Sequence, residues 1–89
     1  MKSPGTIAEA KPLYEEALSI RRRVLGLDHP DLADSLKNLA NWYHAQGKYD
    51  EAEPLYDEAL SITRREFGTD HPDTADSLNN LAGLYLDQG

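Results

Sequence analysis

The sequence predicts an all-α protein built from a helical unit that is repeated, and three observations support this class. Shifting the 89-residue chain by 42 positions (54 − 12) aligns residues 12–47 with 54–89, and 25 of these 36 positions are identical. Identity of this extent at a fixed shift indicates a tandem array. Apolar residues recur with the period of an α-helix, and no segment alternates with the period of a strand.

Four helices are expected. In chain order they cover residues 6–25, 30–46, 49–66 and 72–88. The first begins with capping-box spacing between Thr6 and Glu9. The second carries an apolar stripe formed by Leu36, Leu39, Ala40 and Tyr43, which at about 100° per residue fall on one face. The third carries a similar stripe, formed by Tyr49, Ala52, Tyr56, Ala59, Leu60 and Thr63. Gly47 is expected to cap the second helix in a tight turn, and the fourth helix repeats the second.

The motif DHPD occurs at residues 28–31 and again at 70–73, and its position predicts a helix start. Each copy follows a glycine that ends one helix and precedes the apolar stripe of the next. Proline is tolerated in a first helical turn, and the residue before it is pushed out of the α conformation. The first aspartate is expected to accept amide protons, and the second to lie at the positive end of the helix dipole. The identity of the histidine is not explained by this interpretation.

The alternative interpretation of DHPD is a metal or acid–base site. Asp28 and His29 are sequence neighbours whose side chains should diverge. The two copies lie on helices whose axes are about 8–10 Å apart, too far to share ligands at about 2 Å. No HExxH pair supplies further ligands. We therefore expect no metal, no cofactor and no catalytic residue, and a metal-dependent hydrolase is the least favoured hypothesis.

Composition limits the functional classes further. A formal charge of −7 with 39% hydrophobic residues suits a soluble globular chain. The acidic balance disfavours nucleic acid and anionic membranes as partners. No segment approaches the roughly 20 apolar residues of a membrane span, and the first residues lack a signal-peptide core. Cysteine is absent. These features predict a cytoplasmic protein.

The middle of the chain resembles a tetratricopeptide repeat. The matching residues, in helix–turn–helix order, are Leu36, Leu39, Ala40, Tyr43, Gly47, Ala52, Tyr56 and Ala59. The 42-residue period exceeds the usual period of about 34, and with "LG.DHPD" between units it resembles the kinesin light chain subgroup. The resemblance covers residues 7–89 and implies an α-solenoid segment of antiparallel helix pairs. It also implies a non-catalytic scaffold, in which the first helix of each pair (helix A) lines a groove for a peptide or a partner protein.

The order of helices differs from the usual A–B alternation of that family. It is B-A-B-A: a helix B comes first, residues 30–67 form one complete unit, and a helix A comes last. We expect a single domain over residues 1–89, with about two repeats.

The resemblance places the groove on the face of each helix A opposite its apolar stripe. The corresponding residues are Asp34, Lys37, Asn38, Asn41 and His44 in the second helix, and Asp76, Asn79, Asn80, Gly83, Leu86 and Asp87 in the fourth. Three of them, Lys37, Asn41 and Asn80, match positions with which chaperone-binding tetratricopeptide domains grip a peptide's C-terminal carboxylate. The further basic residues of such a clamp are absent, and Asp34 and Asp76 would repel a carboxylate. A general peptide groove is therefore favoured over a clamp.

The ends of the array form a second candidate surface, for self-association. Repeat arrays depend on contacts between neighbours, and about three repeats are usually needed for stability. The residues expected to be exposed are Ile7, Ala10, Tyr14 and Ala17 in the first helix, and Leu78, Leu81, Ala82 and Tyr85 in the fourth. A fourth helix followed by the first helix of a second copy recreates an A–B pair, so we expect a homo-oligomer, formed either by head-to-tail stacking or by a swap that pairs the ends reciprocally. The alternative function is accordingly a self-assembling structural element with no dedicated ligand. The arginines at 21–23 are assigned to solubility and to the C-terminal end of their helix.

Overall fold

The computed structural model describes residues 4–26 and 29–89, with side chains from residue 8 onward in these ranges. It contains four α-helices, namely α1 (Pro4–Leu25), α2 (Pro30–Ala45), α3 (Tyr49–Phe67) and α4 (Pro72–Gln88). The all-α prediction is confirmed, and the helix bounds differ from the expected ones by at most two residues. Thr6 lies inside α1, so the prediction that it caps this helix was wrong.

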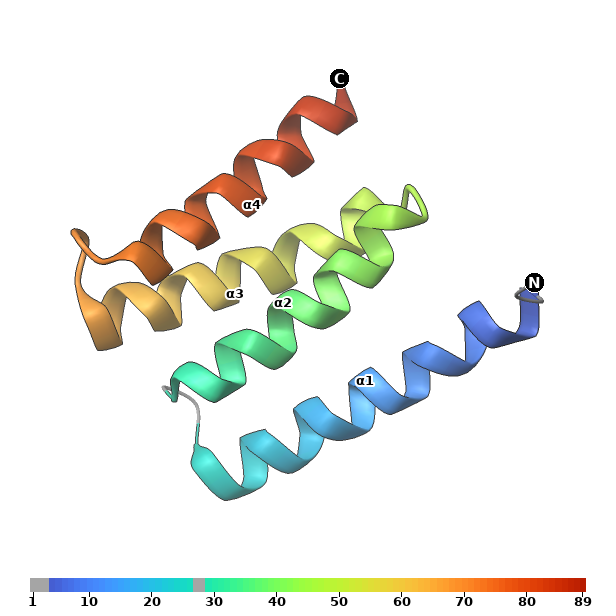
Figure 1. Ribbon diagram of the computed structural model, residues 1–89, viewed down its shortest axis with the longest axis horizontal. Coiled ribbons are helices and arrows are strands. Elements are labelled where there is room, and N and C mark those ends of the chain that lie inside the picture. The colour runs from blue at the N-terminus through green and yellow to red at the C-terminus, as the bar shows by residue number, and fades with distance from the viewer. Residues whose placement is uncertain (1–3, 27–28) are drawn as a thin grey trace.

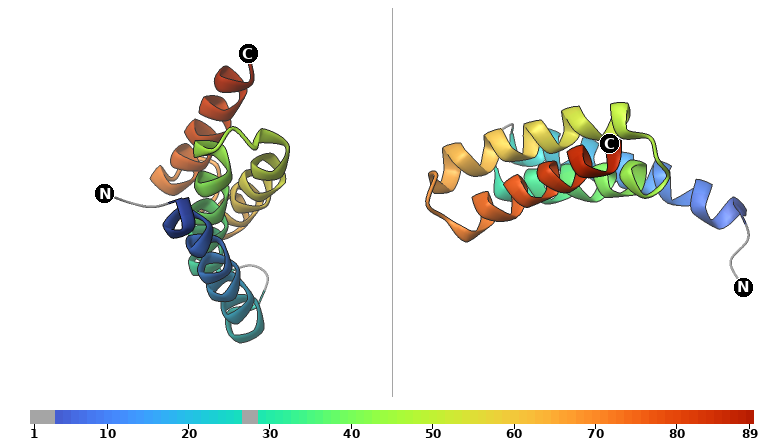
Figure 2. Two further views of the ribbon diagram at one scale, coloured as in Figure 1. Left: turned by 90° about the vertical axis from the view of Figure 1, so that its right-hand side faces the viewer. Right: turned by 90° about the horizontal axis from the view of Figure 1, so that it is seen from above.

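Successive helices run in alternating directions, and each packs on the next (Figure 1). The array is flat, with principal extents of 41 × 35 × 21 Å. The N-terminal end of α1 projects beyond the other three helices (Figure 2). As a result, α2 and α3 each pack on a helix on both sides, whereas among the described helices α1 packs chiefly on α2 and α4 chiefly on α3.

The core lies between α2 and α3, and it is made of the two apolar stripes read from the sequence. Leu36 and Ala40 of α2 have no exposed surface, and neither has Ala59 of α3, while Tyr56 is 1% exposed. Leu18 extends this core into α1, and Leu81 and Leu84 extend it into α4. The helical period therefore identified the central core correctly.

The turn between α2 and α3 depends on Gly47, as expected. This residue has φ +77°, a left-handed conformation that glycine adopts without steric cost. The Gly47 amide donates to the carbonyl of His44, and the Lys48 amide donates to the carbonyl of Tyr43, both at 3.0 Å. These two bonds form a Schellman motif, which ends α2 and turns the chain back into α3.

Each described DHPD segment starts a helix, but the side chain that caps it is the histidine. His71 precedes Pro72 in an extended conformation (φ −112°, ψ 145°), and its Nδ1 accepts the Asp73 amide at 3.1 Å. His29 accepts the Asp31 amide at the same distance. The prediction of a first-aspartate cap is therefore wrong for the second copy, where Asp70 lies in the preceding turn; Asp28 lies outside the described residues. Proline forces the residue before it into the extended conformation that an N-cap needs, so the cap falls on the histidine.

Candidate functional site

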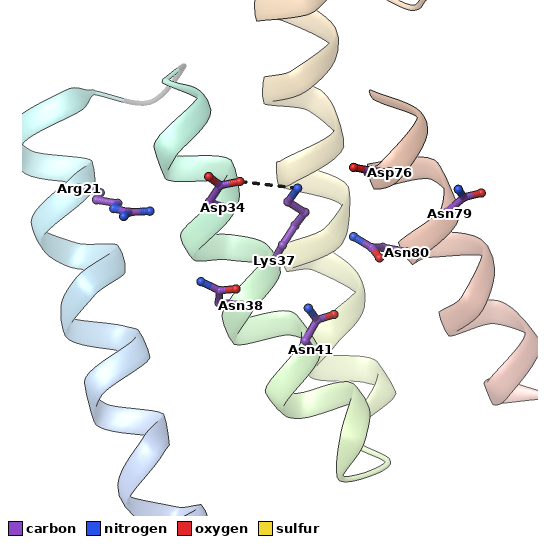
Figure 3. A pocket seen from close by; sticks show the side chains of 8 residues that line it. All are labelled: Arg21, Asp34, Lys37, Asn38, Asn41, Asp76, Asn79 and Asn80. Carbon is purple, nitrogen blue, oxygen red and sulfur yellow. Dashed lines mark ion pairs between the residues drawn. The ribbon is translucent and has the colours of Figure 1, made fainter. Parts of the chain in front are cut away.

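A polar groove of about 560 Å³ crosses α1, α2 and α4 (Figure 3). Its lining residues are Arg21, Asp34, Lys37, Asn38, Asn41, Asp76, Asn79 and Asn80. Seven of these eight were predicted from the sequence. Two cations and two carboxylates balance (2 − 2 = 0), so the groove has no net formal charge although the whole chain carries −7.

The repeat explains why these side chains gather. On α2 they lie three to four residues apart, opposite a stripe whose burial turns them outward. The α4 residues are their copies at a shift of 42: Asp76 corresponds to Asp34, Asn79 to Lys37 and Asn80 to Asn38. The two helices thus present the same face to the groove.

Lys37 lies at the centre of this groove. Its Nζ is 3.7 Å from the Oδ1 of Asp34, and its side chain is 19% exposed. Asp76 and Asn80 point toward it from α4 (Figure 3). Because the Asp34 carboxylate already lies beside the ammonium group, Lys37 does not offer an unpaired positive charge to a ligand.

Arg21 is the lining residue that sequence reasoning missed. Its Nη1 donates to the main-chain carbonyl of Asp31 at 2.7 Å, which fixes the guanidinium at the α1 wall of the groove. The expectation had assigned the residue to the end of its own helix. The contact depends on how α1 crosses α2, and the spacing along one helix carries no signal for that geometry.

Asn41 is held from behind by a chain of hydrogen bonds that joins three helices. The Tyr56 hydroxyl donates to Asn41 Oδ1 and lies 3.2 Å from His44 Nδ1, while His44 Nε2 is 2.6 Å from Asp87 Oδ2. Burial raises the pKa of Tyr56, so its phenol keeps its proton for this donation. With its carbonyl engaged, Asn41 presents its NH₂ group to the groove.

Four of the predicted groove residues do not line it, namely His44, Gly83, Leu86 and Asp87. His44 is directed toward Tyr56 and Asp87 instead, and its side chain is 20% exposed. Gly83 replaces Asn41 in the second copy (41 + 42) and so has no side chain to contribute. Leu86 is 81% exposed and lies beyond the groove.

The end surfaces differ from the expectation in detail. Leu78, Ala82 and Tyr85 of α4 are exposed, as is Ala17 of α1. Leu81 was expected to be exposed but is 7% exposed, because it faces α3, the helix on which α4 packs.

The remaining predicted α1 residues also need correction. Ala10 and Tyr14 are half-buried, with Tyr14 packed on the core. The side chain of Ile7 lies outside the described residues. The large apolar residues that α1 exposes among its described side chains are Leu13, Ile20 and Val24, which are 67%, 42% and 74% exposed. Together with Ala17 they follow the helical period, and that spacing was the signal in the sequence that could have identified them.

Neither a metal cluster nor a membrane span is found in the part of the chain that the structure describes. No three His, Asp or Glu side chains in residues 4–26 and 29–89 approach closely enough to hold a metal ion. No helix in the same ranges is long and apolar enough to cross a bilayer.

Stacked antiparallel helix pairs that share a core and carry a groove on alternate helices define an α-solenoid of helix–turn–helix repeats. A family model described as tetratricopeptide repeat matches residues 5–62 and 36–89. The chain belongs to the tetratricopeptide repeat family, a family of non-catalytic repeat scaffolds that generally mediate protein–protein interaction.

One solved structure supports the kinesin-light-chain-like type of repeat. BtubC (BKLC) from P. vanneervenii is 31% identical and superposes with a TM-score of 0.85, over 94% of this chain and 33% of that one. The chain therefore spans about a third of the length of BtubC. No curated protein matches the chain.

Proposed function

We propose that the protein is a non-catalytic cytoplasmic binding module that holds an extended segment of a partner protein in the groove over α2 and α4. Its domain covers residues 1–89, with residues 30–67 as the complete repeat unit. The observation that carries this proposal is the set of asparagines that converge on one groove, namely Asn38, Asn41, Asn79 and Asn80.

Asparagine side chains suit the recognition of a peptide main chain. Each amide has two donor hydrogens and an acceptor oxygen, so it can pair with a peptide N–H or C=O whatever the peptide's side chains are. An extended segment has no internal hydrogen bonds and offers these groups along its whole length. The groove volume of about 560 Å³ also lies within the range of ligand sites, roughly 300–1,000 Å³.

Electrostatics favours a main-chain ligand over a terminal carboxylate. A carboxylate in the groove would meet Asp34 and Asp76, which line it together with Lys37, and Lys37 is already paired with Asp34. A neutral peptide main chain meets no such repulsion. The asparagines therefore supply the recognition, and the two cations and two carboxylates that line the groove restrict the side chains that it accepts.

The proposal can be tested with a library of phage-displayed peptides selected against the chain. The test variant is Asn38→Ala with Asn80→Ala, which removes one amide from α2 and its repeat copy from α4. The matched control is Ser19→Ala with Ser61→Ala, exposed repeat copies on α1 and α3. We expect the selected peptides to bind the test variant roughly tenfold or more weakly, since each lost hydrogen bond is worth about 1 kcal/mol.

Two results would contradict the proposal that peptides bind in this groove. The first is a set of selected peptides that binds the test variant and the control equally, because the peptides then occupy another surface. The second is the recovery of no peptide with a dissociation constant below about 1 mM.

Structural self-assembly is the second candidate function, and the exposed apolar residues of α1 and α4 favour it. Large exposed apolar side chains gathered on one face mark interaction sites. These residues are separate from the groove, so the two candidates can be tested independently.

A further inference from the structure

We propose that α4 of one copy of this chain docks on α1 of a second copy, in the register that α2 and α3 adopt inside the chain. This deepens the self-assembly candidate, and it does not depend on any residue of the groove. The partner is thus a second copy of the chain, and the internal α2–α3 interface is the template for the contact.

The receiving surface is on α1, which carries the same residues that α3 uses to cover α2. Ala59 and Ile62 of α3 have no exposed surface. Their repeat copies on α1 are Ala17, which is exposed, and Ile20, which is 42% exposed. Identical side chains are therefore enclosed in one copy and open in the other.

The donating surface is on α4, which repeats the face that α2 presents to α3. Leu36 and Ala40 are fully buried, whereas their copies Leu78 and Ala82 are exposed, Leu78 at 42%. Tyr43 is 8% exposed, and its copy Tyr85 is 50% exposed. Since the inner faces of α2 and α3 pack closely, α4 and α1 carry two halves of an interface whose fit the chain already demonstrates.

An ion pair also carries over to the contact between copies. Arg22 of α1 holds Glu58 of α3 through both carboxylate oxygens, at 2.8 and 2.9 Å. One repeat further along, Arg22 corresponds to Arg64 (22 + 42), and Glu58 corresponds to Glu16 of the second copy (58 − 42). Docking in the proposed register therefore brings the exposed Arg64 to the exposed Glu16 of the next copy, and opposite charges at one position help to fix the register.

Substitutions at the contact make it weaker than the internal interface. Gly83 and Leu86 stand where Asn41 and His44 stand in the first unit. Inside the chain those two residues hydrogen-bond Tyr56, whose copy at the contact is Tyr14 of the second chain. The Tyr14 hydroxyl therefore gains no equivalent partner, and association must also offset the loss of free rotation and translation. A reversible, concentration-dependent contact follows.

The docking surfaces differ, so the contact is heterologous. A copy that has donated its α4 still has a vacant α1, and the copy that received it still has a vacant α4. A contact of this kind adds further copies in series or closes a ring, in contrast to a two-fold contact between like surfaces.

The decisive test is a mixing experiment followed by sedimentation equilibrium. Ala17→Arg blocks the α1 surface and Ala82→Arg blocks the α4 surface, and both alanines are exposed within one copy. We expect the mass of the unaltered chain to rise above 9.9 kDa with concentration and each variant alone to remain at 9.9 kDa. An equal mixture should form a one-to-one pair and stop there, because only one intact α4 and one intact α1 can meet.

Three controls make each outcome decisive. Ser61→Arg, on the exposed face of α3, should associate as the unaltered chain does. Circular dichroism of both alanine variants should show the helical content of the unaltered chain, which separates lost docking from lost folding. The groove variant Asn38→Ala with Asn80→Ala should keep the same rise in mass, so a failure of peptide binding and a failure of docking are distinguishable.

Several outcomes would overturn the proposal. One is an unaltered chain that stays at the monomer mass up to about 1 mM, which would leave another repeat or a different protein as the occupant of these faces. Another is a mixture of folded variants that does not pair. A third is that only one of the two alanine variants stays monomeric by itself while the other associates as the unaltered chain does, which would indicate contact between like surfaces.

A charge exchange tests the register itself. Arg64→Glu and Glu16→Arg should each raise the dissociation constant of the contact, by roughly threefold, which is the effect of an exposed ion pair. Mixing the two variants should restore the affinity, because each contact between unlike variants pairs opposite charges. No restoration would contradict the proposed register.

Discussion

Helices α1 and α3 are two copies of one helix in different surroundings. Residues 12–25 and 54–67 agree at 10 of 14 positions, so their different burial comes mainly from their neighbours. Helix α3 packs on both α2 and α4, and its Ile62 has no exposed surface. Helix α1 packs on α2, and its Ile20 is 42% exposed. In this array the same side chain is a core residue or a surface residue according to the helix beside it, as expected where stability lies in contacts between neighbours.

Removing the same side chain from both copies should give the largest contrast. We expect Ile62→Ala to lower the free energy of unfolding by about 3 kcal/mol, because it leaves a cavity in a closed core. Ile20→Ala should cost about 0.5 kcal/mol or less, since a partly exposed side chain loses little contact. Urea unfolding at low protein concentration measures both values. Equal costs would show that α1 is enclosed as fully as α3.

The tyrosine pair should show a smaller contrast. Tyr56→Phe removes the hydrogen bonds to Asn41 and His44, and we expect a loss of about 1.5 kcal/mol. Within the described part of the chain the Tyr14 hydroxyl makes no hydrogen bond, so Tyr14→Phe should change stability by a few tenths of a kcal/mol. Thermal unfolding of the two variants makes the comparison. A larger loss of stability from Tyr14→Phe than from Tyr56→Phe would contradict the assignment of the hydrogen bonds to Tyr56.

The capping contact is local and should be worth the same in both copies. His29→Ala and His71→Ala should each lose about 1 kcal/mol from the cap, because each removes the side-chain acceptor at a helix start. His71→Ala should cost more in total, because the His71 ring also stacks on Phe67 with the ring centroids 4.2 Å apart. Asparagine at either position should restore most of the stability lost from the cap, since it is a favourable N-cap residue. Urea unfolding measures all four variants. An asparagine variant as unstable as its alanine counterpart would show that the imidazole has a role other than capping.

Alkaline pH should lower the stability of the folded chain gradually, and this effect should be smaller than those above. Burial raises the pKa of Tyr56 above the ordinary value of 10.0, so the folded chain holds this proton more tightly than the unfolded chain. The contribution of the protonated Tyr56 to the free energy of unfolding is complete below pH 10.0, and it is lost as the pH rises through the raised pKa of the folded chain. We expect the urea midpoint to fall across this window, and Tyr56→Phe to remove part of the fall. If the urea midpoint of Tyr56→Phe fell with pH as steeply as that of the unaltered chain, the prediction would be contradicted.

The sequence contained most of the fold because each helix carries its own periodic signal. Leu36, Ala40 and Tyr56 fall on stripes that the period alone defines, and Gly47 marks the turn between them. The capping histidines were not foreseen, although the proline that sets their conformation was recognised. Aspartate is the common capping residue, and nothing in the spacing shows that an imidazole one residue later takes that role.

The groove was predictable on the two helices that repeat one face, and less so elsewhere. Asp34 and Asp76 occupy equivalent positions of a copied helix, so identifying one identifies the other. Arg21 enters the groove through the crossing of α1 and α2, and Asp87 draws His44 away from it across a gap of 43 residues. Leu81 was misassigned for a related reason, because the period defines a stripe without stating which side of it a neighbour covers.

Native-state hydrogen exchange, measured residue by residue at low and high protein concentration, tests most directly whether neighbours decide stability in this chain. Amide protection reports the free energy of local opening along each helix. In dilute solution we predict the slowest exchange in α2 and α3 and faster exchange in α1 and α4, with the difference narrowing as concentration rises and copies dock. Uniform protection across all four helices in dilute solution would contradict the account.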